Sequence, residues 1–160
     1  MSEYDSFYTI LDECVTLYTN MLNFENAKYQ VIIHKDITQL EEMLKVEQAM
    51  IMQASVLEKE RASAQTTLGV DAYTLLEMAE SGRPAERERL LSYRDRLLKV
   101  LQDIKGVNAK SMQLIELRLK DTEARLEQSG YIQDLHTYDG TGTATENNAG
   151  INKNLITKSV

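Results

Sequence analysis

The first two long stretches of the chain repeat apolar residues at intervals of three and four, which is the spacing of one face of an α-helix. Residues 4–33 contain no glycine or proline, and their stripe is Tyr8, Leu11, Val15, Tyr18, Leu22, Tyr29 and Ile33, with Phe7, Cys14 and Met21 beside it. The stripe of residues 37–68 is Ile37, Leu40, Leu44, Glu47, Ile51, Ala54, Leu57, Arg61, Ala64 and Leu68. Each stretch is predicted to be one long helix.

The ends of these helices carry stop and start signals. Asp36, with Gln39 three residues later, has the form of a capping box, so the second helix is predicted to begin at Ile37. A helix that continues through residue 36 is the weaker alternative. Gly69 is a natural C-terminal stop. A short helix is predicted within residues 71–80.

A third long helix is predicted from Pro84 to about Gln128, because proline suits the first position of a helix. Its stripe is Leu90, Tyr93, Leu97, Leu101, Ile104, Asn108, Ser111, Ile115, Leu119, Thr122 and Leu126. The stripe keeps its phase across Gly106, which favours one continuous helix. A break at Gly106, giving a fourth helix, is the alternative.

After Gly130 the sequence becomes rich in glycine, threonine, asparagine and aspartate, with few large apolar residues. Such a segment cannot bury enough apolar surface to offset its ordering entropy. The chain is therefore divided into a helical bundle domain, residues 1–129, and a flexible polar tail, residues 130–160. Three long helices with short connections predict an all-α fold, an elongated antiparallel bundle.

Composition and charge argue against several classes of protein. The chain has 160 residues, of which 42% are hydrophobic and 27% charged, so one domain is expected. Its formal net charge of −7 has the wrong sign for binding nucleic acid or an anionic membrane surface. The single cysteine, Cys14, cannot close an intramolecular disulfide, and no apolar run approaches the ~18 residues of a membrane span. We expect a cytoplasmic protein.

Chemistry-bearing motifs are not found in the sequence. His34 and His136 lie far apart, and Cys14 has no other metal ligand at a suitable spacing and is expected in the core. The Gly140-Thr141-Gly142 segment lacks the lysine and the flanking elements of a phosphate-binding loop. No metal, no cofactor and no enzymatic activity are expected.

Polar residues on the apolar stripes are the more informative feature, and they are Glu47, Arg61, Asn108 and Ser111. Polar groups in such places need partners. Glu47, Arg61 and Asn108 are either at the margin of the stripe with solvated heads, or form a polar layer that fixes the register of the helices. The antiparallel order of the second and third long helices predicts that Glu47 and Asn108 approach each other.

The third helix, about 67 Å long at 1.5 Å per residue, is predicted to extend past partners of about 45 and 47 Å. Leu114 and Leu117 fall about 100° and 160° away from its stripe, where an isolated bundle would place charged residues. Exposed apolar groups there suggest a docking surface, unless the tail or a second copy of the chain covers them. The candidate contact residues are Leu114, Ile115, Leu117 and Leu119, with Tyr131 as an anchor in the tail.

The second helix carries the pattern D-x-x-x-L-x-x-x-L-x-x-E-Q from Asp36 to Gln48, followed by Leu57-Glu58, Arg61 and a terminal Leu68-Gly69. This pattern resembles the most recognisable stretch of the FlgN family of flagellar export chaperones. The segments Val107-Asn108, Leu114-Ile115, Tyr138-Asp139-Gly140 and Asn154-Leu155-Ile156 extend the resemblance along nearly the whole chain. Ser111 departs from it, because many members carry an asparagine there.

The resemblance implies a chaperone of flagellar type III secretion that binds hook-associated proteins, the hook-filament junction components, before their export. It also implies client binding by the C-terminal helical region, and it makes the export apparatus a further candidate partner. A helix-in-groove mode would suit an amphipathic terminal segment of the client. The rival hypothesis is a structural coiled-coil protein that forms homo-oligomers through the same stripes.

Overall fold

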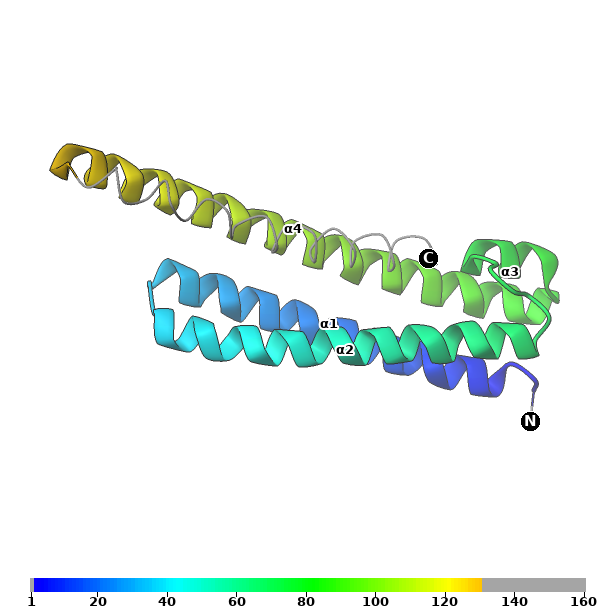
Figure 1. The fold of residues 1–160 in the computed structure, drawn as a ribbon. Helices are drawn as coiled ribbons and strands as arrows, with labels where there is room; N and C mark the ends of the chain where they lie inside the picture. Colours follow the sequence, from blue (N-terminus) through cyan, green and yellow to red (C-terminus); the bar gives the residue numbers. More distant parts are fainter. Residues whose placement is uncertain (1, 131–160) are drawn as a thin grey trace.

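The computed structural model describes residues 2–130, which form four α-helices (Figure 1). They are α1 (Asp5–Ile33), α2 (Ile37–Thr67), α3 (Leu75–Ser81) and α4 (Pro84–Ser129). No strand occurs in this part of the chain. The all-α prediction is confirmed. Predictions about Tyr131 and the rest of the tail concern residues outside the described range.

Local sequence signals explain where the helices begin. The Asp36 side chain accepts a 3.0 Å hydrogen bond from the backbone N–H of Gln39, so α2 starts where the capping signal predicted. Thr74 and Glu77 form a reciprocal capping box at the start of α3. Pro84 occupies the first turn of α4. The weaker alternative, a helix continuing through residue 36, is wrong.

Helix α4 is one unbroken helix of 46 residues. Gly106 lies inside it, so the alternative of a fourth long helix is wrong. The helix ends at Gly130, whose φ of +80° is the left-handed conformation that glycine adopts without a steric penalty.

The hydrophobic core lies in the half of the molecule that contains α3. Its buried apolar residues are Phe7, Tyr8, Leu11, Cys14, Leu17, Tyr18 and Met21 of α1, Ala54 and Leu57 of α2, Leu75, Met78 and Ala79 of α3, and Leu90, Tyr93, Leu97 and Val100 of α4. Cys14 is a core residue, as predicted. Because the short α3 packs on α4, the core is closed at this end of the bundle.

Helix α1 is the central element of the bundle. It packs against both α2 and α4, whereas no pair of Cα atoms joins α2 to α4 within 8 Å in the described part of the chain. Helices α1 and α4 run in the same direction, with α2 antiparallel to them (Figure 1). The α1–α4 register is marked by the stacked rings of Tyr8 and Tyr93, 5.6 Å apart, and by a 2.6 Å hydrogen bond from the Tyr93 hydroxyl to Asp12.

The buried stripe of α4 differs in one respect from the predicted one. Leu90, Tyr93, Leu97 and Val100 are buried, so the stripe alternates steps of three and four, which average 3.5 residues as in a coiled coil. The predicted stripe continued through Leu101, which is only partly buried.

Candidate functional site

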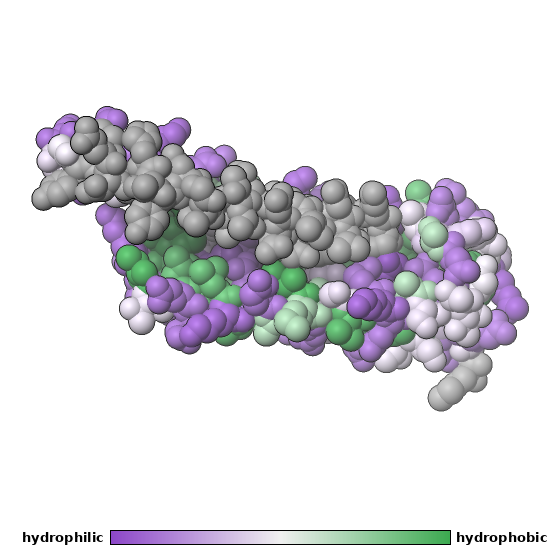
Figure 2. Space-filling model, in the orientation of Figure 1, coloured by the Kyte–Doolittle hydropathy of each residue, from purple (hydrophilic) through white to green (hydrophobic). Residues whose placement is uncertain are grey.

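The end of the bundle opposite α3 is much less tightly packed. Beyond Val100, Ser111 is the only residue of α4 that is buried, and no residue of α2 before Ala54 is buried. At this end Ile33 of α1 and Val46 of α2 have exposed apolar side chains, and so do five further residues: Ile37 and Leu44 of α2 and Met112, Leu117 and Leu119 of α4. We call these five residues, with the half-buried Leu114 and Ile115, the open end. Hydrophobic surface is visible at the α1–α2 end of the bundle below α4 (Figure 2).

Exposure at the open end corrects several predicted core positions. Ile37 and Leu44 belong to the predicted α2 stripe, yet Ile37 is 70% exposed and Leu44 is also exposed. Leu119 belongs to the predicted α4 stripe and is exposed as well. The physical reason is that α2 and α4 do not approach each other, so the apolar faces of these turns have only α1 to pack against.

The two leucines that were expected to lie off the stripe differ in how far they are buried. Leu117 is 65% exposed, in agreement with that expectation. Leu114 is half-buried, because a stripe with steps of three and four that passes through Ser111 continues to Leu114 and Arg118, which is also half-buried. Of the candidate contact residues, Leu117 and Leu119 are therefore the most accessible.

Arg118 fixes the position of α4 against the end of α1. Its guanidinium donates hydrogen bonds to the backbone carbonyl oxygens of Ile32 and Ile33, the latter at 2.7 Å. The last turn of α1 contains no basic residue of its own, so Arg118 supplies the positive charge that the C-terminal end of the α1 dipole favours. The remaining turns of α4, after Arg118, continue past the α1–α2 turn (Figure 1). The predicted overhang of this helix is thus present.

A buried ionic cluster lies at the base of the open end. The Nζ atom of Lys28 on α1 is 2.8 Å from Glu25 Oε2 and 2.6 Å from Glu47 Oε1 of α2. Glu47 therefore reaches another helix, as one of the two sequence interpretations required. Its partner is Lys28 rather than Asn108: no hydrogen bond joins Glu47 to Asn108 in the described residues, because α1 is the helix that packs against α2 here.

The pKa values in this cluster shift in opposite directions. Burial, reinforced by the adjacent Glu47, raises the pKa of the Glu25 carboxyl to about 7, against a lowering by Lys28. Burial opposes charge on Glu47 too, but its bonds to Glu25 and Lys28 hold its pKa below the ordinary value. Burial lowers the pKa of Lys28, and the bonds to the two glutamates raise it by more. Burial therefore disfavours the charge of Glu25, whereas Glu47 is held in its charged form beside the Lys28 ammonium group.

Ser111 lies at the same level of the bundle. The pairs Tyr8–Tyr93 and Ile33–Arg118 are each 85 residues apart, and this separation brings Ser111 next to the level of Glu25. The Ser111 hydroxyl is buried and has no hydrogen-bond partner among the described residues. On α4 the buried polar residue at this level is Ser111, whereas Asn108 is half-buried, and a register-setting polar layer of Glu47, Arg61 and Asn108 stays a prediction.

Arg61 stabilises the closed end of the bundle. It is 5% exposed, so the interpretation with a solvated head is wrong for this residue. Its guanidinium bonds Glu58, at 2.9 Å, and Gln65, at 3.1 Å, within α2. The Gln65 amide then donates to the backbone carbonyl oxygen of Tyr73, which ties α2 to the loop before α3.

Sequence reasoning missed four residues of these networks: Glu25, Lys28, Gln65 and Arg118. Glu25 and Arg118 do fall on the buried stripes of α1 and α4, but a pattern of apolar residues does not mark charged positions. The only signal was that the first stripe loses its apolar residues between Glu25 and Lys28. In the structure this gap is filled by the ionic cluster.

Comparison with known proteins decides the family. The family model for FlgN, described as FlgN protein, matches residues 1–146. The chain belongs to the FlgN family. The match includes α1–α4 entirely, and therefore both the open end and the ionic cluster. No curated protein and no solved structure matches the chain.

FlgN membership makes the chain a flagellar export chaperone, from a chaperone family rather than an enzyme family. None of the helices in residues 2–130 is long and apolar enough to cross a membrane. Within the same residues, no group of three histidine, cysteine, aspartate or glutamate side chains is arranged to hold a metal ion.

Proposed function

We propose that this FlgN chain binds hook-associated proteins, the components of the hook-filament junction, in the cytoplasm and prevents their association before secretion. The observation that carries the proposal is the open end, where α2 and α4 leave large apolar side chains exposed on both sides of α1. An export chaperone needs such a surface, because its client has an aggregation-prone segment to be covered until export.

The exposed apolar residues of the open end suit the apolar face of an amphipathic helix of the client. A helix seated between the first half of α2 and the second half of α4 would lie against exposed apolar residues of both helices. Helix-in-groove recognition of this kind uses apolar anchors on one face of the bound helix. A fully desolvated leucine contributes about 1.5 to 3 kcal/mol, so a few such anchors give useful affinity.

Calorimetry with a purified hook-associated protein tests the proposal. The double variant Leu117→Glu/Leu119→Glu places two charges on the open end at exposed positions, where the fold does not depend on leucine. We expect a loss of affinity of two orders of magnitude or more with an unchanged melting curve. Met52→Glu is the matched control, because Met52 is 70% exposed on α2 outside the open end. Equal affinity of the double variant and the control would contradict the proposed site.

The rival hypothesis, a structural protein that self-associates, gives a different result. It requires a stable homo-oligomer that the same double variant dissociates, and no binding of a hook-associated client. Sedimentation velocity of the wild-type chain and the double variant, each alone, distinguishes the two hypotheses.

A further inference from the structure

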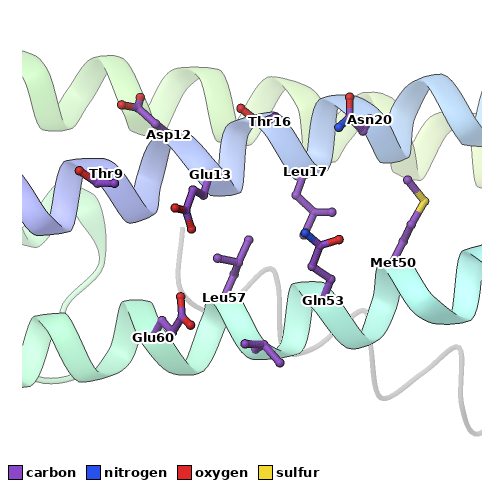
Figure 3. Close-up of a pocket in the computed structure, with 11 residues that line it drawn as sticks. Thr9, Asp12, Glu13, Thr16, Leu17, Asn20, Met50, Gln53, Leu57 and Glu60 are labelled. Atoms are coloured by element: carbon purple, nitrogen blue, oxygen red, sulfur yellow. The ribbon is translucent and has the colours of Figure 1, made fainter.

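A groove runs between α1 and α2 in the half of the molecule that holds the core (Figure 3). Its walls come from one face of each helix, and its lining residues include Leu17, Leu57, Val56 and Met50 as the apolar members. Leu17 and Leu57 are buried and form the floor, whereas Val56 is 54% exposed. The groove therefore offers apolar surface that the helices of the described chain do not cover.

The charged residues along the groove are all acidic. They are Asp12, Glu13 and Glu60, and no lysine or arginine lines it. Asp12 is already bonded to the Tyr93 hydroxyl of α4. The side chains of Glu13 and Glu60 point into the space between the helices from opposite walls (Figure 3). Both are exposed, and neither forms an ion pair with another residue of the described chain.

Glu13 and Glu60 make the rim of the groove negative, so a cationic side chain seated over the apolar floor would be attracted to both carboxylates. Lysine and arginine have the right chemistry for this position, because their apolar stems can cover Val56 while the charged heads reach the carboxylates. The geometry thus selects a helical segment with apolar residues on one face and basic residues beside that face.

We propose that this groove is a second protein-binding surface of the chain, which docks a basic amphipathic helix of a partner protein. The groove is distinct from the open end: along α2, its nearest lining residue, Met50, is about 9 Å from Leu44. The chaperone can therefore hold a client at one surface and a basic partner helix at the other.

The probe for this surface is a synthetic amphipathic helix with leucines along one face and lysines on both flanks. Its binding to the full chain is followed by an environment-sensitive fluorophore on Gln53→Cys, an exposed lining position. Cys14 does not compete for the label, because it is buried and its burial raises the pKa of the thiol to about 12.

Glu13→Gln/Glu60→Gln is the decisive variant, and Glu41→Gln/Glu123→Gln, at exposed sites outside the groove, is its charge-matched control. We expect the first pair to weaken probe binding about tenfold or more, and the control pair to leave it unchanged. The affinity of the wild-type chain is expected to fall as salt is added.

Three results would overturn the proposal: equal affinity of both variant pairs, a fluorophore that does not respond to the probe, or loss of probe binding in Leu117→Glu/Leu119→Glu. The last result would show that the probe occupies the open end. Client capture by the open end is measured separately. A groove that does not bind the probe therefore leaves the proposed chaperone function unaffected.

Discussion

Arg118 of α4 donates a 2.7 Å hydrogen bond to the backbone carbonyl oxygen of Ile33, the last residue of α1. The same guanidinium also bonds the carbonyl oxygen of Ile32. A helix end leaves its last carbonyl groups short of partners, and Arg118 bonds two of them, of which the Ile32 carbonyl also accepts from the backbone N–H of Lys35. The Arg118 bonds also hold α4 in register at the level where the α1–α2 hairpin turns, and so they position the open end.

Removing this bond is expected to loosen the open end. Arg118→Ala should lower the free energy of unfolding by about 1 to 3 kcal/mol, because charge-assisted bonds to two carbonyl groups are lost. Urea unfolding followed by circular dichroism measures the change. The control is Arg125→Ala, whose partner Asp121 is on the exposed overhang, and which should change stability by less than about 0.5 kcal/mol. Equal effects of the two substitutions would show that the Arg118 bonds contribute nothing.

The buried Glu25 carboxyl predicts a pH dependence of stability. Its pKa in the folded chain is raised to about 7, so its proton is bound more tightly in the folded than in the unfolded state. The stability from this group is therefore fully present below the unfolded pKa of about 4.5 and is lost as the pH rises through 7. Glu25→Gln should remove this decline, and the variant should gain stability over the wild type at pH 8 but not at pH 4.

Chemical unfolding at a series of pH values provides the measurement. Glu47→Gln is the control, because the pKa of Glu47 is shifted the other way and its charge holds Lys28. That substitution should destabilise the chain at neutral pH. A wild-type stability that does not fall between pH 5 and pH 8, or a Glu25→Gln variant that is less stable at pH 8, would contradict this interpretation of the cluster.

The core places a limit on what the tail contributes to folding. The core of the described residues lies between Phe7 and Val100, and few large apolar residues follow Gly130 in the sequence. Deleting residues 131–160 should therefore leave the thermal midpoint within a few degrees of the full chain. Differential scanning calorimetry of the two proteins measures this, and a loss of cooperative unfolding in the shortened chain would show that the tail docks on the bundle.

Sequence patterns predicted the helices well where a boundary had its own local cause. The Asp36 cap, the proline at position 84 and the glycine at position 130 act within one turn, so no tertiary information was needed. The partners of the charged side chains could not be predicted from local patterns in this way. Which side chain meets Glu47 depends on which helix lies beside α2, and the pattern of α2 alone could not show that α1, carrying Lys28, takes that place.

The open end could be predicted only in part, for a related reason. The excess length of α4 follows from its stripe, but the exposure of Ile37 and Leu44 follows from the separation of α2 and α4. Residues on a regular apolar stripe look like core positions unless the spacing between helices is known. The stripe of α4 also follows steps of three and four, and a straight 3.6-residue projection places Leu114 too far from it.

Single glutamate substitutions at Leu114 and Leu117 are expected to separate packing from binding. Leu117→Glu should leave the melting curve unchanged, because the side chain is largely exposed and glutamate is a good helix former. Leu114→Glu should lower the thermal midpoint by several degrees, because a charged group would enter a half-buried position in line with Ser111 and Arg118. Circular dichroism melts of the two variants measure this difference.

The same two variants test client capture. We expect Leu117→Glu to reduce the affinity for a hook-associated protein without any loss of stability, which would place Leu117 in the contact. Leu114→Gln, which adds no charge at the half-buried site, shows whether any loss of capture in Leu114→Glu comes from weaker packing. If Leu117→Glu melts early instead, Leu117 is covered in solution, and the homo-oligomer hypothesis accounts for that result better than a client site does.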